Sequence, residues 1–359
     1  MAKEKKKIFL DCDLMKYPNS GLYHYCLNLG MEIQSLLKAQ NAGEIFFYLP
    51  PEKVNLFGPE ARYVAERKSF WNFFRSPLQA CDIWHAPFQS GRIVPDKKKY
   101  PGIKVVLTIH DLNPLHEGKS LDEQQQSLAH TQSLIDKTDA IVCISQFCKD
   151  DVLKNCDVGD KPIYVIYNGT HKVHAPQLND TSYKPKRPFL FGMGYVNTKK
   201  NYHVLLALLK NENIELVIAG RLDEPDYIEK MKQQAIKMGV FDRVHILGPV
   251  SEGEKGWYFQ HCLAFVHPSL AEGFGAPVVE AMQFGKPIFL SSLTSLPEIG
   301  GDAAFYFPSF DPDKMQEVFF RGMIKYEKEM MIEQIKKRGM EFDWKEKAKQ
   351  YLIVYQSLY

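Results

Sequence analysis

Two glutamates, Glu272 and Glu280, stand eight positions apart in the stretch HPSLAEGFGAPVVEAMQFGKP (267–287), separated by Gly-Phe-Gly and a proline. An apolar run typical of a buried strand ends where this stretch begins, so a loop at the carboxyl end of a strand is expected next. Pro277 suits the first turn of a helix that follows the loop. The spacing therefore predicts Glu272 in the loop and Glu280 about one turn into the helix.

This loop and helix favour an anion that has hydroxyl groups beside it. A helix N-terminus presents unpaired N–H groups and partial positive charge, and Gly273 and Gly275 let a ligand approach the backbone closely. A carboxylate can accept hydrogen bonds from the two hydroxyls of a sugar diol. The stretch therefore suggests a nucleotide-sugar. Plain strand-to-helix packing is the alternative that the residues leave open.

Further polar residues that could do chemistry directly follow strand-like runs. Ligands of parallel α/β sheets bind at the carboxyl ends of the strands, which is where such residues lie. The candidates at these places are His110, Asp111, Ser145, Lys199, Lys200 and Arg221. Two sheets that face each other would place them around one cleft.

The elements that position these residues alternate strand-like and helix-like segments. The strand-like runs are short, apolar on both faces and spaced widely enough for crossover helices, as in buried parallel sheets. A first series lies at 7–14, 44–50, 82–87, 104–112, 139–145 and 162–169, and a second at 189–194, 215–220, 244–250, 263–269, 287–292 and 303–307. The pattern predicts a doubly wound α/β fold that occurs twice.

Two domains are expected, with the linker between them in the Pro-rich, polar segment 172–188. We assign 1–180 to an N-terminal domain and 181–342 to a C-terminal domain. The tail at 343–359 predicts a helix whose apolar residues share one face: Trp344, Ala348, Tyr351, Leu352, Tyr355 and Leu358. The residues alone leave open whether this helix caps its own domain or crosses back to the first.

Composition narrows the function classes. Apolar content of 45% and charged content of 25% are those of a soluble globular protein, and a formal net charge of +2 argues against a nucleic-acid partner. The seven cysteines include no CxxC pair, which argues against a zinc site or a disulfide framework. The sequence shows no apolar stretch long enough for a membrane span or a signal peptide, so a cytoplasmic protein is expected.

The run E-G-F-G-A-P-V-V-E-A-M-x-x-G-K-P resembles the signature of family 4 retaining glycosyltransferases, which are two-domain enzymes of the GT-B fold. LVIAGRLDEP, TSLPEIGGDAAFYF and FDWKEKAKQYLIVYQSL are similar in order and spacing, as are TIHDLNPLHE, VCISQFCKDDV and VIYNG in the first half. The resemblance covers nearly the whole chain. It implies two Rossmann-like domains that face a central cleft, an N-terminal one for the acceptor and a C-terminal one for the nucleotide-sugar. It also implies that the terminal helix crosses back to the N-terminal domain.

Residue by residue, the resemblance implies roles at the site. Glu272 would contact the donor hexose at the reaction centre, and Glu280 would hold the ribose diol. Lys200 would neutralise the departing diphosphate, and His110 would touch the donor sugar from the first domain. The residues that would line the donor are Gly273, Phe274, Gly275 and, beside the base, Val250. The resemblance implies neither a metal ligand nor a separate cofactor.

The chain departs from the family pattern at two places. Many relatives carry an arginine directly after the glycine that corresponds to Gly194, but this chain has Tyr195 there. Lys199 or Arg221 would supply the second positive charge on the diphosphate, and we place Lys199 first because it is closer in sequence. The first strand-to-helix loop, LMKYPNSGLYHY, has a single glycine, Gly21, which we still expect near the donor phosphate or the acceptor.

The resemblance implies a retaining, metal-independent hexosyltransferase with a GDP- or UDP-linked donor. The first domain looks more like mannosyl-transferring relatives, which makes GDP-mannose the first donor to consider. The expected acceptor is a saccharide or lipid-linked glycan in the synthesis of a cell-surface polysaccharide such as lipopolysaccharide. A peripheral contact with the cytoplasmic face of the membrane is left open. Two rival hypotheses are a sugar-nucleotide epimerase of the same fold and a catalytically inactive nucleotide-sugar binding module.

Other residues receive structural interpretations. His85, His116 and His267 are left as structural histidines without an assigned role. Gly192 and Gly194 lack the third glycine and the acidic residue of a dinucleotide-binding loop, so NAD binding is not expected. The aromatic stretch SFWNFFRSP (69–77) is assigned to core packing, with an acceptor-binding patch as the alternative.

Overall fold

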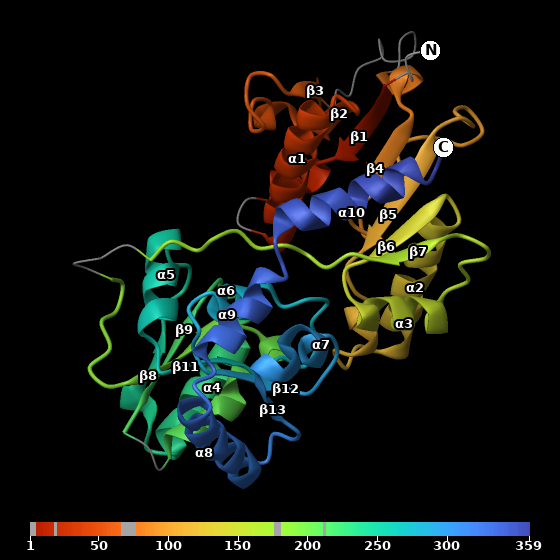
Figure 1. Ribbon diagram of the computed structural model, residues 1–359. Coiled ribbons are helices and arrows are strands. Elements are labelled where there is room, and N and C mark those ends of the chain that lie inside the picture. The colour runs from red at the N-terminus through yellow and green to blue at the C-terminus, as the bar shows by residue number, and fades with distance from the viewer. Residues whose placement is uncertain (1–4, 18–19, 66–76, 176–180, 211–212) are drawn as a thin grey trace. The chain divides into compact units, whose positions relative to one another are not determined.

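The computed structural model describes residues 5–17, 20–65, 77–175, 181–210 and 213–359, and its chain separates into two units (Figure 1). The first unit is Met1–Gly169 together with Asp343–Tyr359, and the second is Thr170–Phe342. Each unit has its own parallel sheet and its own hydrophobic core. The aromatic stretch 69–77, apart from its last residue, lies outside the described residues.

Within the described residues, the first unit is built on a parallel sheet ordered β3-β2-β1-β4-β5-β6-β7. Its strands are β1 (Lys6–Asp11), β2 (Gly43–Leu49), β3 (Arg62–Ala65), β4 (Ile83–Ala86), β5 (Lys104–Ile109), β6 (Ala140–Cys143) and β7 (Ile163–Val165). All but β3 occur where the sequence predicts strands. The patterns do not predict β3, because it is short and only partly buried. The order reverses between β1 and β4, and ligands of such sheets bind at the carboxyl ends beside this switch point.

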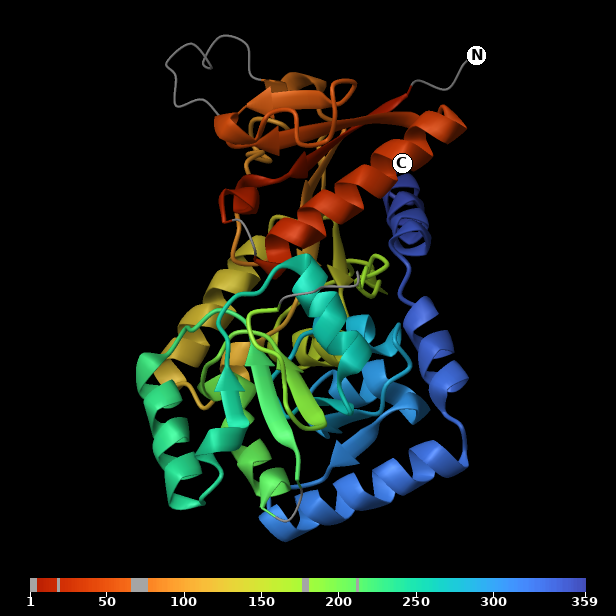
Figure 2. The same cartoon turned by 90° about the vertical axis from the view of Figure 1, so that its left-hand side faces the viewer.

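Helices cover both faces of this sheet. The α-helices that the structure describes in the first unit are α1 (Gly21–Gln40), α2 (Leu121–Ile135), α3 (Gln146–Asn155) and α10 (Trp344–Gln356). Successive strand residues point to opposite faces, so Leu10 joins the core under α1 and α10 while Phe9 joins the core with α2 and α3. Figure 2 shows α1 running along its face of the sheet.

The terminal helix α10 belongs to the first unit, which decides the alternative that its apolar face leaves open. The residues of the predicted apolar face are buried in the core that α10 shares with α1, or packed against it: Trp344, Ala348, Tyr351, Leu352, Tyr355 and Leu358. The helix therefore crosses back to the N-terminal part of the chain, as the family resemblance implies.

A chain of buried hydrogen bonds joins α10 to the sheet beneath it. Tyr355 OH lies 2.7 Å from Nδ1 of His85, whose Nε2 lies 2.8 Å from Thr108 Oγ1. Tyr351 OH lies 3.2 Å from the same threonine oxygen and 2.5 Å from Tyr25 OH. Because buried polar groups are costly unless they are paired, this network fixes the helix in one position.

In the described residues of the second unit, the parallel sheet is ordered β10-β9-β8-β11-β12-β13. Its strands are β8 (Phe189–Met193), β9 (Glu215–Ala219), β10 (Val244–Ile246), β11 (Ala264–His267), β12 (Ile288–Ser291) and β13 (Phe305–Phe307). Each lies in a run where the sequence predicts a strand. Here the order reverses between β8 and β11, which places a second switch point at the carboxyl ends of these two strands.

Helices again pack on both faces of the sheet. The α-helices that the structure describes in this unit are α4 (Pro225–Lys237), α5 (Glu252–His261), α6 (Ala276–Met282), α7 (Leu296–Gly300), α8 (Pro312–Lys328) and α9 (Ile332–Met340). Its 3-10 helices include η6 (Thr198–Lys200) and η7 (Tyr202–Leu209). One face shares its core with η7, α4 and α8. On the other face, the ring of Phe191 lies 5.3 Å from Tyr258 and 5.2 Å from Phe259 of α5. No helix of the described chain is both long and apolar enough to cross a membrane.

The segment 172–188, which the sequence suggests as the interdomain linker, lies in the second unit. The chain passes between the units after Gly169 and again after Phe342. Tyr183 stacks on His245 with ring centroids 3.8 Å apart and donates a hydrogen bond to Glu215 at 2.8 Å. Tyr183, in the described part of this segment, thus packs against the second unit.

Removing the Tyr351 hydroxyl is expected to loosen α10. In Tyr351→Phe, the buried Tyr25 hydroxyl keeps only its 3.5 Å contact with Thr108 Oγ1, and a buried polar group that loses its partner costs about 1–3 kcal/mol. Urea denaturation and amide hydrogen exchange across α10 would measure the loss. The matched control Tyr164→Phe removes a more exposed hydroxyl, 3.1 Å from Ser357 Oγ, and should cost less than about 0.5 kcal/mol. Equal losses in the two variants would contradict a special role for the buried network.

Acid should destabilise the first unit through His85. Burial is the main reason that the pKa of His85 is lowered from 6.5 to about 3. Between these pH values the unfolded chain therefore binds a proton at His85, whereas the folded chain does not. The contribution of neutral His85 to the free energy of unfolding is fully present above about pH 6.5. It is lost as the pH falls toward about 3, by about 1.4 kcal/mol per pH unit. Urea titrations at about pH 7 and about pH 5 should show this loss, reduced in His85→Asn because an amide does not titrate. An equally steep pH dependence in that variant would refute the assignment.

Candidate active site

The switch point between β8 and β11 brings together the loops that follow these strands. After β8 the chain enters η6, where Asn197 Oδ1 accepts a hydrogen bond from Lys200 N at 3.1 Å. Asn201 then adopts the left-handed conformation with a φ of 59°, and its side-chain amide donates to Pro268 O at 3.2 Å. These bonds hold Lys200 beside the loop that carries Glu272.

Glu272 is buried between two side chains that donate to it. Lys200 forms an ion pair with Oε1, and His267 Nε2 donates to the same oxygen at 2.8 Å. The backbone of Glu272 is also fixed, because its N–H donates to Thr294 Oγ1 at 2.9 Å and its carbonyl accepts from Ser295 Oγ at 2.8 Å. Only 8% of Glu272 is exposed. The carboxylate is therefore held in one orientation by side-chain and backbone contacts.

Burial and pairing set the charges of this cluster. Burial alone would raise the pKa of Glu272, but the Lys200 ammonium and the hydrogen bond from His267 outweigh it and hold that pKa well below its usual value. Burial lowers the pKa of His267, against the opposing pull of Glu272. At neutral pH the cluster is therefore a carboxylate, an ammonium and a neutral imidazole that donates its Nε2–H.

Two buried polar atoms beside the cluster find no hydrogen-bond partner among the described residues, namely His267 Nδ1 and Tyr202 OH. Gly194 keeps the neighbouring space open. A β-carbon built on Gly194 would lie 3.2 Å from both Tyr202 OH and Lys200 Cε, and its φ of 143° also favours glycine. Buried polar atoms without partners are rare in folded proteins and gather at functional sites.

The loop over 272–275 has the predicted form, with its aromatic side chain packed inward. Gly275 adopts a left-handed φ of 85° just before α6, and Glu280 lies about one turn into that helix, as the spacing predicts. The Phe274 ring is only 3% exposed and packs 5.4 Å from the ring of Phe342. Any contact of Phe274 with a donor, like that of the buried Gly273, therefore rests on its backbone.

Glu280 is paired with a lysine that the sequence patterns do not single out. Lys255 Nζ of α5 lies 3.0 Å from Glu280 Oε1 and 2.8 Å from Glu252 Oε2. Burial raises the pKa of Glu280, although Lys255 opposes this shift. The side chain of Glu280 retains 20% exposure. It thus faces a polar partner, with part of the carboxylate open to a ligand hydroxyl.

The other predicted donor-binding residues of the second unit lie in loops near this edge. Arg221 follows β9, is exposed, and donates from Nε to Asp223 Oδ1 at 3.0 Å. Lys199 lies in η6 and is half-buried, and Val250 lies between β10 and α5. These positions agree with loops at the carboxyl ends of the strands, and the roles of the residues stay predictions.

In the first unit, His110 follows β5 and is buried between two aromatic rings. The ring centroids of Tyr25 and Phe88 lie 4.7 and 5.1 Å from that of His110. Nε2 of His110 donates to Pro87 O at 2.9 Å, and its backbone N–H donates to Gln89 Oε1 at 3.0 Å. Burial lowers the pKa of His110 to about 4. The imidazole is therefore neutral at neutral pH, with Nδ1 as a hydrogen-bond acceptor.

Three more predicted residues of the first unit have local structural contacts. Ser145 caps α3, since its Oγ accepts the N–H of Cys148 at 3.1 Å. Asp111 Oδ1 accepts the N–H of Asn113 at 3.1 Å. Gly21 is the first residue of α1, and a β-carbon built there would meet nothing within 4 Å. Sterics within the unit therefore do not demand a glycine at this position.

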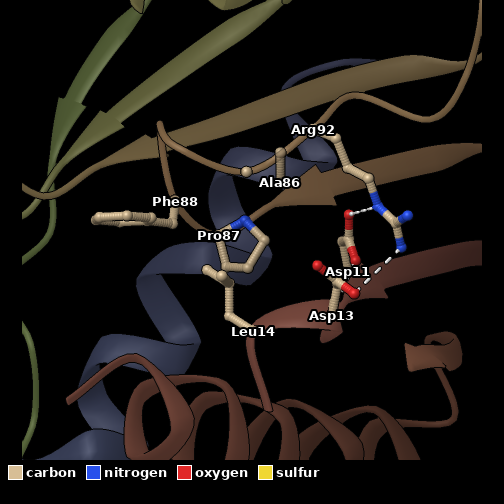
Figure 3. Close-up of a pocket in the computed structure, with 8 residues that line it drawn as sticks. Asp11, Asp13, Leu14, Ala86, Pro87, Phe88 and Arg92 are labelled. Carbon is tan, nitrogen blue, oxygen red and sulfur yellow. Dashed lines mark hydrogen bonds and ion pairs between the residues drawn. The ribbon is translucent and has the colours of Figure 1, made fainter. Parts of the chain in front are cut away.

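A small cavity lies at the switch point of the first sheet, where β1 and β4 end (Figure 3). Arg92 lines it beside two carboxylates, with Nε 3.6 Å from Asp11 Oδ2 and a terminal nitrogen 3.7 Å from Asp13 Oδ1. The cavity volume of about 10 Å3 is room for roughly one water molecule or one hydroxyl group. Pro87 and Phe88 line it and also contact His110, so the cavity and the histidine are neighbours.

Sequence patterns alone miss two members of the site. His267 is left without a role because a lone histidine at the end of a strand is usually structural, yet it donates to Glu272. Its position five residues before Glu272, at the start of the same loop, is the signal that could have found it. Lys255 gives no such signal, because its contact with Glu280 is made between two helices far apart in sequence.

Two family models match most of the chain. The model described as Glycosyltransferase Family 4 matches residues 38–172, and the model described as Glycosyl transferases group 1 matches residues 177–338. The first match contains His110, and the second contains Lys200, Glu272 and Glu280.

Curated relatives are similar at modest identity. The O-antigen chain mannosyltransferase RfbU of Salmonella typhimurium is 26% identical over 206 residues, which cover 56% of this chain and 55% of the relative. The serotype-specific mannosyltransferase WbdA of Escherichia coli is 27% identical over 236 residues, which cover 60% and 28%. The chain thus spans about half of the length of the first relative and less of the second. The O-antigen chain mannosyltransferase B of Escherichia coli is 23% identical, over 98% of this chain and 100% of the relative.

Solved structures share the fold at low identity. Sucrose-phosphate synthase from Thermosynechococcus elongatus matches with a TM-score of 0.76 at 17% identity, covering 99% of both chains. Anabaena HepE, solved in complex with UDP and glucose, matches with a TM-score of 0.75 at 18% identity, covering 98% of this chain and all of its own. The chain belongs to the group 1 glycosyltransferases of glycosyltransferase family 4 and has their two-domain GT-B fold.

Proposed function

We propose that the chain is a hexosyltransferase that moves a sugar from a nucleoside diphosphate to a hydroxyl group of a saccharide or lipid-linked glycan. The observation that carries this proposal is the buried contact of Lys200 and His267 with Glu272 at the carboxyl edge of the second sheet. An ammonium beside a carboxylate suits a substrate that is anionic at its diphosphate and rich in hydroxyl groups at its sugar.

In this proposal Lys200 and Glu272 act on opposite charges. When the bond between the anomeric carbon and the diphosphate oxygen breaks, negative charge develops on the leaving group and positive charge on the sugar. Lys200 stabilises the leaving group, because a preorganised cation in a buried site needs no reorganisation. Glu272, oriented by His267 through Oε1, offers its second oxygen to a sugar hydroxyl and places negative charge beside the sugar.

Retention of the anomeric configuration and independence of metal ions are parts of the proposal. Pairing lowers the pKa of Glu272 and so weakens it as a covalent nucleophile. We therefore favour attack on the face that the diphosphate leaves. The acceptor oxygen bonds to the anomeric carbon, the carbon–oxygen bond to the diphosphate breaks, and the acceptor proton passes to a diphosphate oxygen. Cationic side chains led by Lys200 would supply the positive charge on the leaving group.

Mannose is the first sugar to test, and the acceptor belongs to a cell-surface glycan. Support comes from relatives named as O-antigen chain mannosyltransferases. The structural neighbour HepE is solved with UDP-glucose, so the proposal includes UDP-linked donors beside GDP-mannose. A direct assay with each donor identifies the preferred base and sugar.

The first unit is proposed to bind the acceptor. Its support is the cavity at the β1–β4 switch point, where Asp11, Asp13 and Arg92 offer both hydrogen-bond acceptors and a donor in a space for one hydroxyl group. The cavity adjoins His110 through Pro87. A contact of His110 with the donor sugar stays a prediction from the family resemblance.

Release of nucleoside diphosphate, measured with and without acceptors, tests the proposal. The full chain would be incubated with GDP-mannose or UDP-glucose and a panel of methyl glycosides and lipid-linked monosaccharides. We expect release that depends on an acceptor, with a glycosylated product. Conversion of the donor sugar without any acceptor would point to an epimerase. Tight donor binding without turnover would point to an inactive binding module.

Lys200→Ala should lower kcat by about a hundred- to a thousand-fold, as loss of a major electrostatic stabiliser does. Removing one partner of a buried ion pair can cost about 3–5 kcal/mol of stability, so a second variant is needed. Lys200→Met combined with Glu272→Gln removes both charges and should fold. Lys230→Ala, which removes an exposed lysine of α4, is the charge-matched control. Turnover near the wild-type rate in a folded Lys200 variant would refute the role of this lysine.

Glu280→Gln should abolish recognition of the ribose diol. Hydrogen bonds to a charged group contribute about 1.5–3 kcal/mol, so the wild type should bind GDP or UDP at least about tenfold more tightly than its 2′,3′-dideoxy analogue. In Glu280→Gln, calorimetric titration should show little difference between the affinities for the nucleotide and for its 2′,3′-dideoxy analogue. The control Glu252→Gln removes the other carboxylate that contacts Lys255; Glu252 is the exposed partner of this pair. This variant should still distinguish the nucleotide from its dideoxy analogue. Full discrimination in Glu280→Gln would show that the diol binds elsewhere.

A further inference from the structure

The turn at Gly194 and Tyr195 lies against two cationic side chains. A β-carbon built on Gly194 would be 3.7 Å from Lys200 Nζ. The guanidinium carbon of Arg221 lies 4.5 Å from the centroid of the Tyr195 ring, in a cation–π contact. Consecutive residues of one turn thus contact a lysine from η6 and an arginine from the loop after β9.

The loop that carries Arg221 is locked to this turn. Val196 N donates to Arg221 O at 2.8 Å, and Gly194 N donates to Ala219 O at 3.0 Å. A β-carbon built on Gly220 would lie 1.9 Å from Gly194 O, and Gly220 has a φ of 142°. Only glycine permits so close an approach of two backbones. Arg221 directly follows this lock, so its backbone position relative to the turn is fixed.

Arg221 has donors to offer a ligand although it contacts Asp223. Its side chain is 61% exposed, and only Nε and one terminal nitrogen contact Asp223 Oδ1, at 3.0 and 2.5 Å. A guanidinium carries five N–H groups in a planar fork that matches phosphate oxygens. Exposed ion pairs contribute little stability. A phosphate can therefore share Arg221 with Asp223 or replace the aspartate.

A diphosphate needs more positive charge than Lys200 provides. The Lys200 ammonium is paired with the buried carboxylate of Glu272, so the two side chains together carry no net charge. A nucleoside diphosphate brings more than one negative charge, and charge-assisted hydrogen bonds to phosphate require further donors. A second cation at the same edge of the sheet would complete the site.

Lys199, which sequence proximity places first for this role, directly precedes Lys200 in η6. Successive residues of a 3-10 helix point about 120° apart, so the side chains of Lys199 and Lys200 diverge from η6. The backbone of Lys199 serves the neighbouring loop, because its carbonyl accepts from Leu270 N at 2.8 Å and from Ser269 Oγ at 3.3 Å.

We propose that Arg221, stacked on Tyr195, is the second cation that binds the diphosphate of the donor, and that Tyr195 is its positioning residue. This inference rests on the proposed function, because it names a further contact of the same donor site. Arg221 binds phosphate oxygens directly. Tyr195 acts through Arg221, by holding the guanidinium over its ring.

Calorimetric titration of the full chain with GDP, UDP, guanosine and uridine tests this inference. Arg221→Ala should weaken binding of the preferred nucleoside diphosphate by about ten- to a hundred-fold, the loss expected for charge-assisted hydrogen bonds. Binding of the matching nucleoside should not change, because it has no phosphate. Lys230→Ala removes a cation from the groove that Asp223 also lines and should change the affinity by less than about twofold.

Tyr195→Ala should weaken binding of the nucleoside diphosphate by about two- to fivefold, which corresponds to the energy of a cation–π contact at an exposed site. Tyr195→Phe keeps an aromatic face and should restore the affinity. In the Arg221→Ala background, Tyr195→Ala should have no further effect, because a positioning residue acts only through its partner. An effect of Tyr195→Ala that persists in this background would overturn the positioning role.

The outcomes separate this inference from the proposed function. If the wild type binds GDP or UDP and Arg221→Ala binds it with the same affinity, the inference about Arg221 is overturned, whereas the proposed function stands. A loss in Lys199→Ala without one in Arg221→Ala overturns it in favour of the lysine. If the wild type binds neither nucleotide, both the proposed function and the inference fail.

Discussion

The buried ion pair between Lys200 and Glu272 is the constraint around which this edge of the second unit is built. Taking two charges out of water costs several kcal/mol per ion unless each finds partners. This cost is comparable with the whole free energy of unfolding of a single domain. The Glu272 carboxylate meets this requirement with Lys200 and His267, and the backbone of Glu272 is held by Thr294 and Ser295. The loops after β8 and β11 must therefore stay in register, and the switch point becomes a rigid site.

Self-neutralisation gives the pair a second property that matters for a donor substrate. Without a ligand, the lysine and the glutamate compensate each other, so the site does not hold an uncompensated buried charge. A diphosphate can share Lys200 because an ammonium has three N–H donors. In the proposed function, a sugar hydroxyl binds the carboxylate oxygen that the lysine and His267 do not contact. The same pair can thus serve the anionic and the polyol parts of one substrate.

Much of the fold follows from local patterns, whereas the partners within the site do not. Buried parallel strands leave apolar runs with nearly no exceptions, and only β3, short and partly exposed, escapes prediction. The apolar face of α10 predicts a buried helix, but its place in the first unit is a tertiary fact that only the family resemblance supplies. Sequence distance also hides the contacts of Arg221 with Tyr195 and of Lys255 with Glu280, because adjacent loops and helices bring together residues that are far apart in the chain.

The two switch points show how one topology can serve two kinds of ligand. Both place a carboxylate and a cation at the carboxyl ends of the strands where the order reverses, Asp11 with Arg92 in the first unit and Glu272 with Lys200 in the second. In the first unit Arg92 Nε lies 3.6 Å from Asp11 Oδ2, and a cavity lies beside them. A loose pair with space favours a neutral hydroxyl, which can donate to one group and accept from the other. A tight pair with further cations nearby favours an anion, which competes for the lysine. In the proposed function, this difference in the spacing of the charges suits the first site to an acceptor hydroxyl and the second to a nucleotide-sugar.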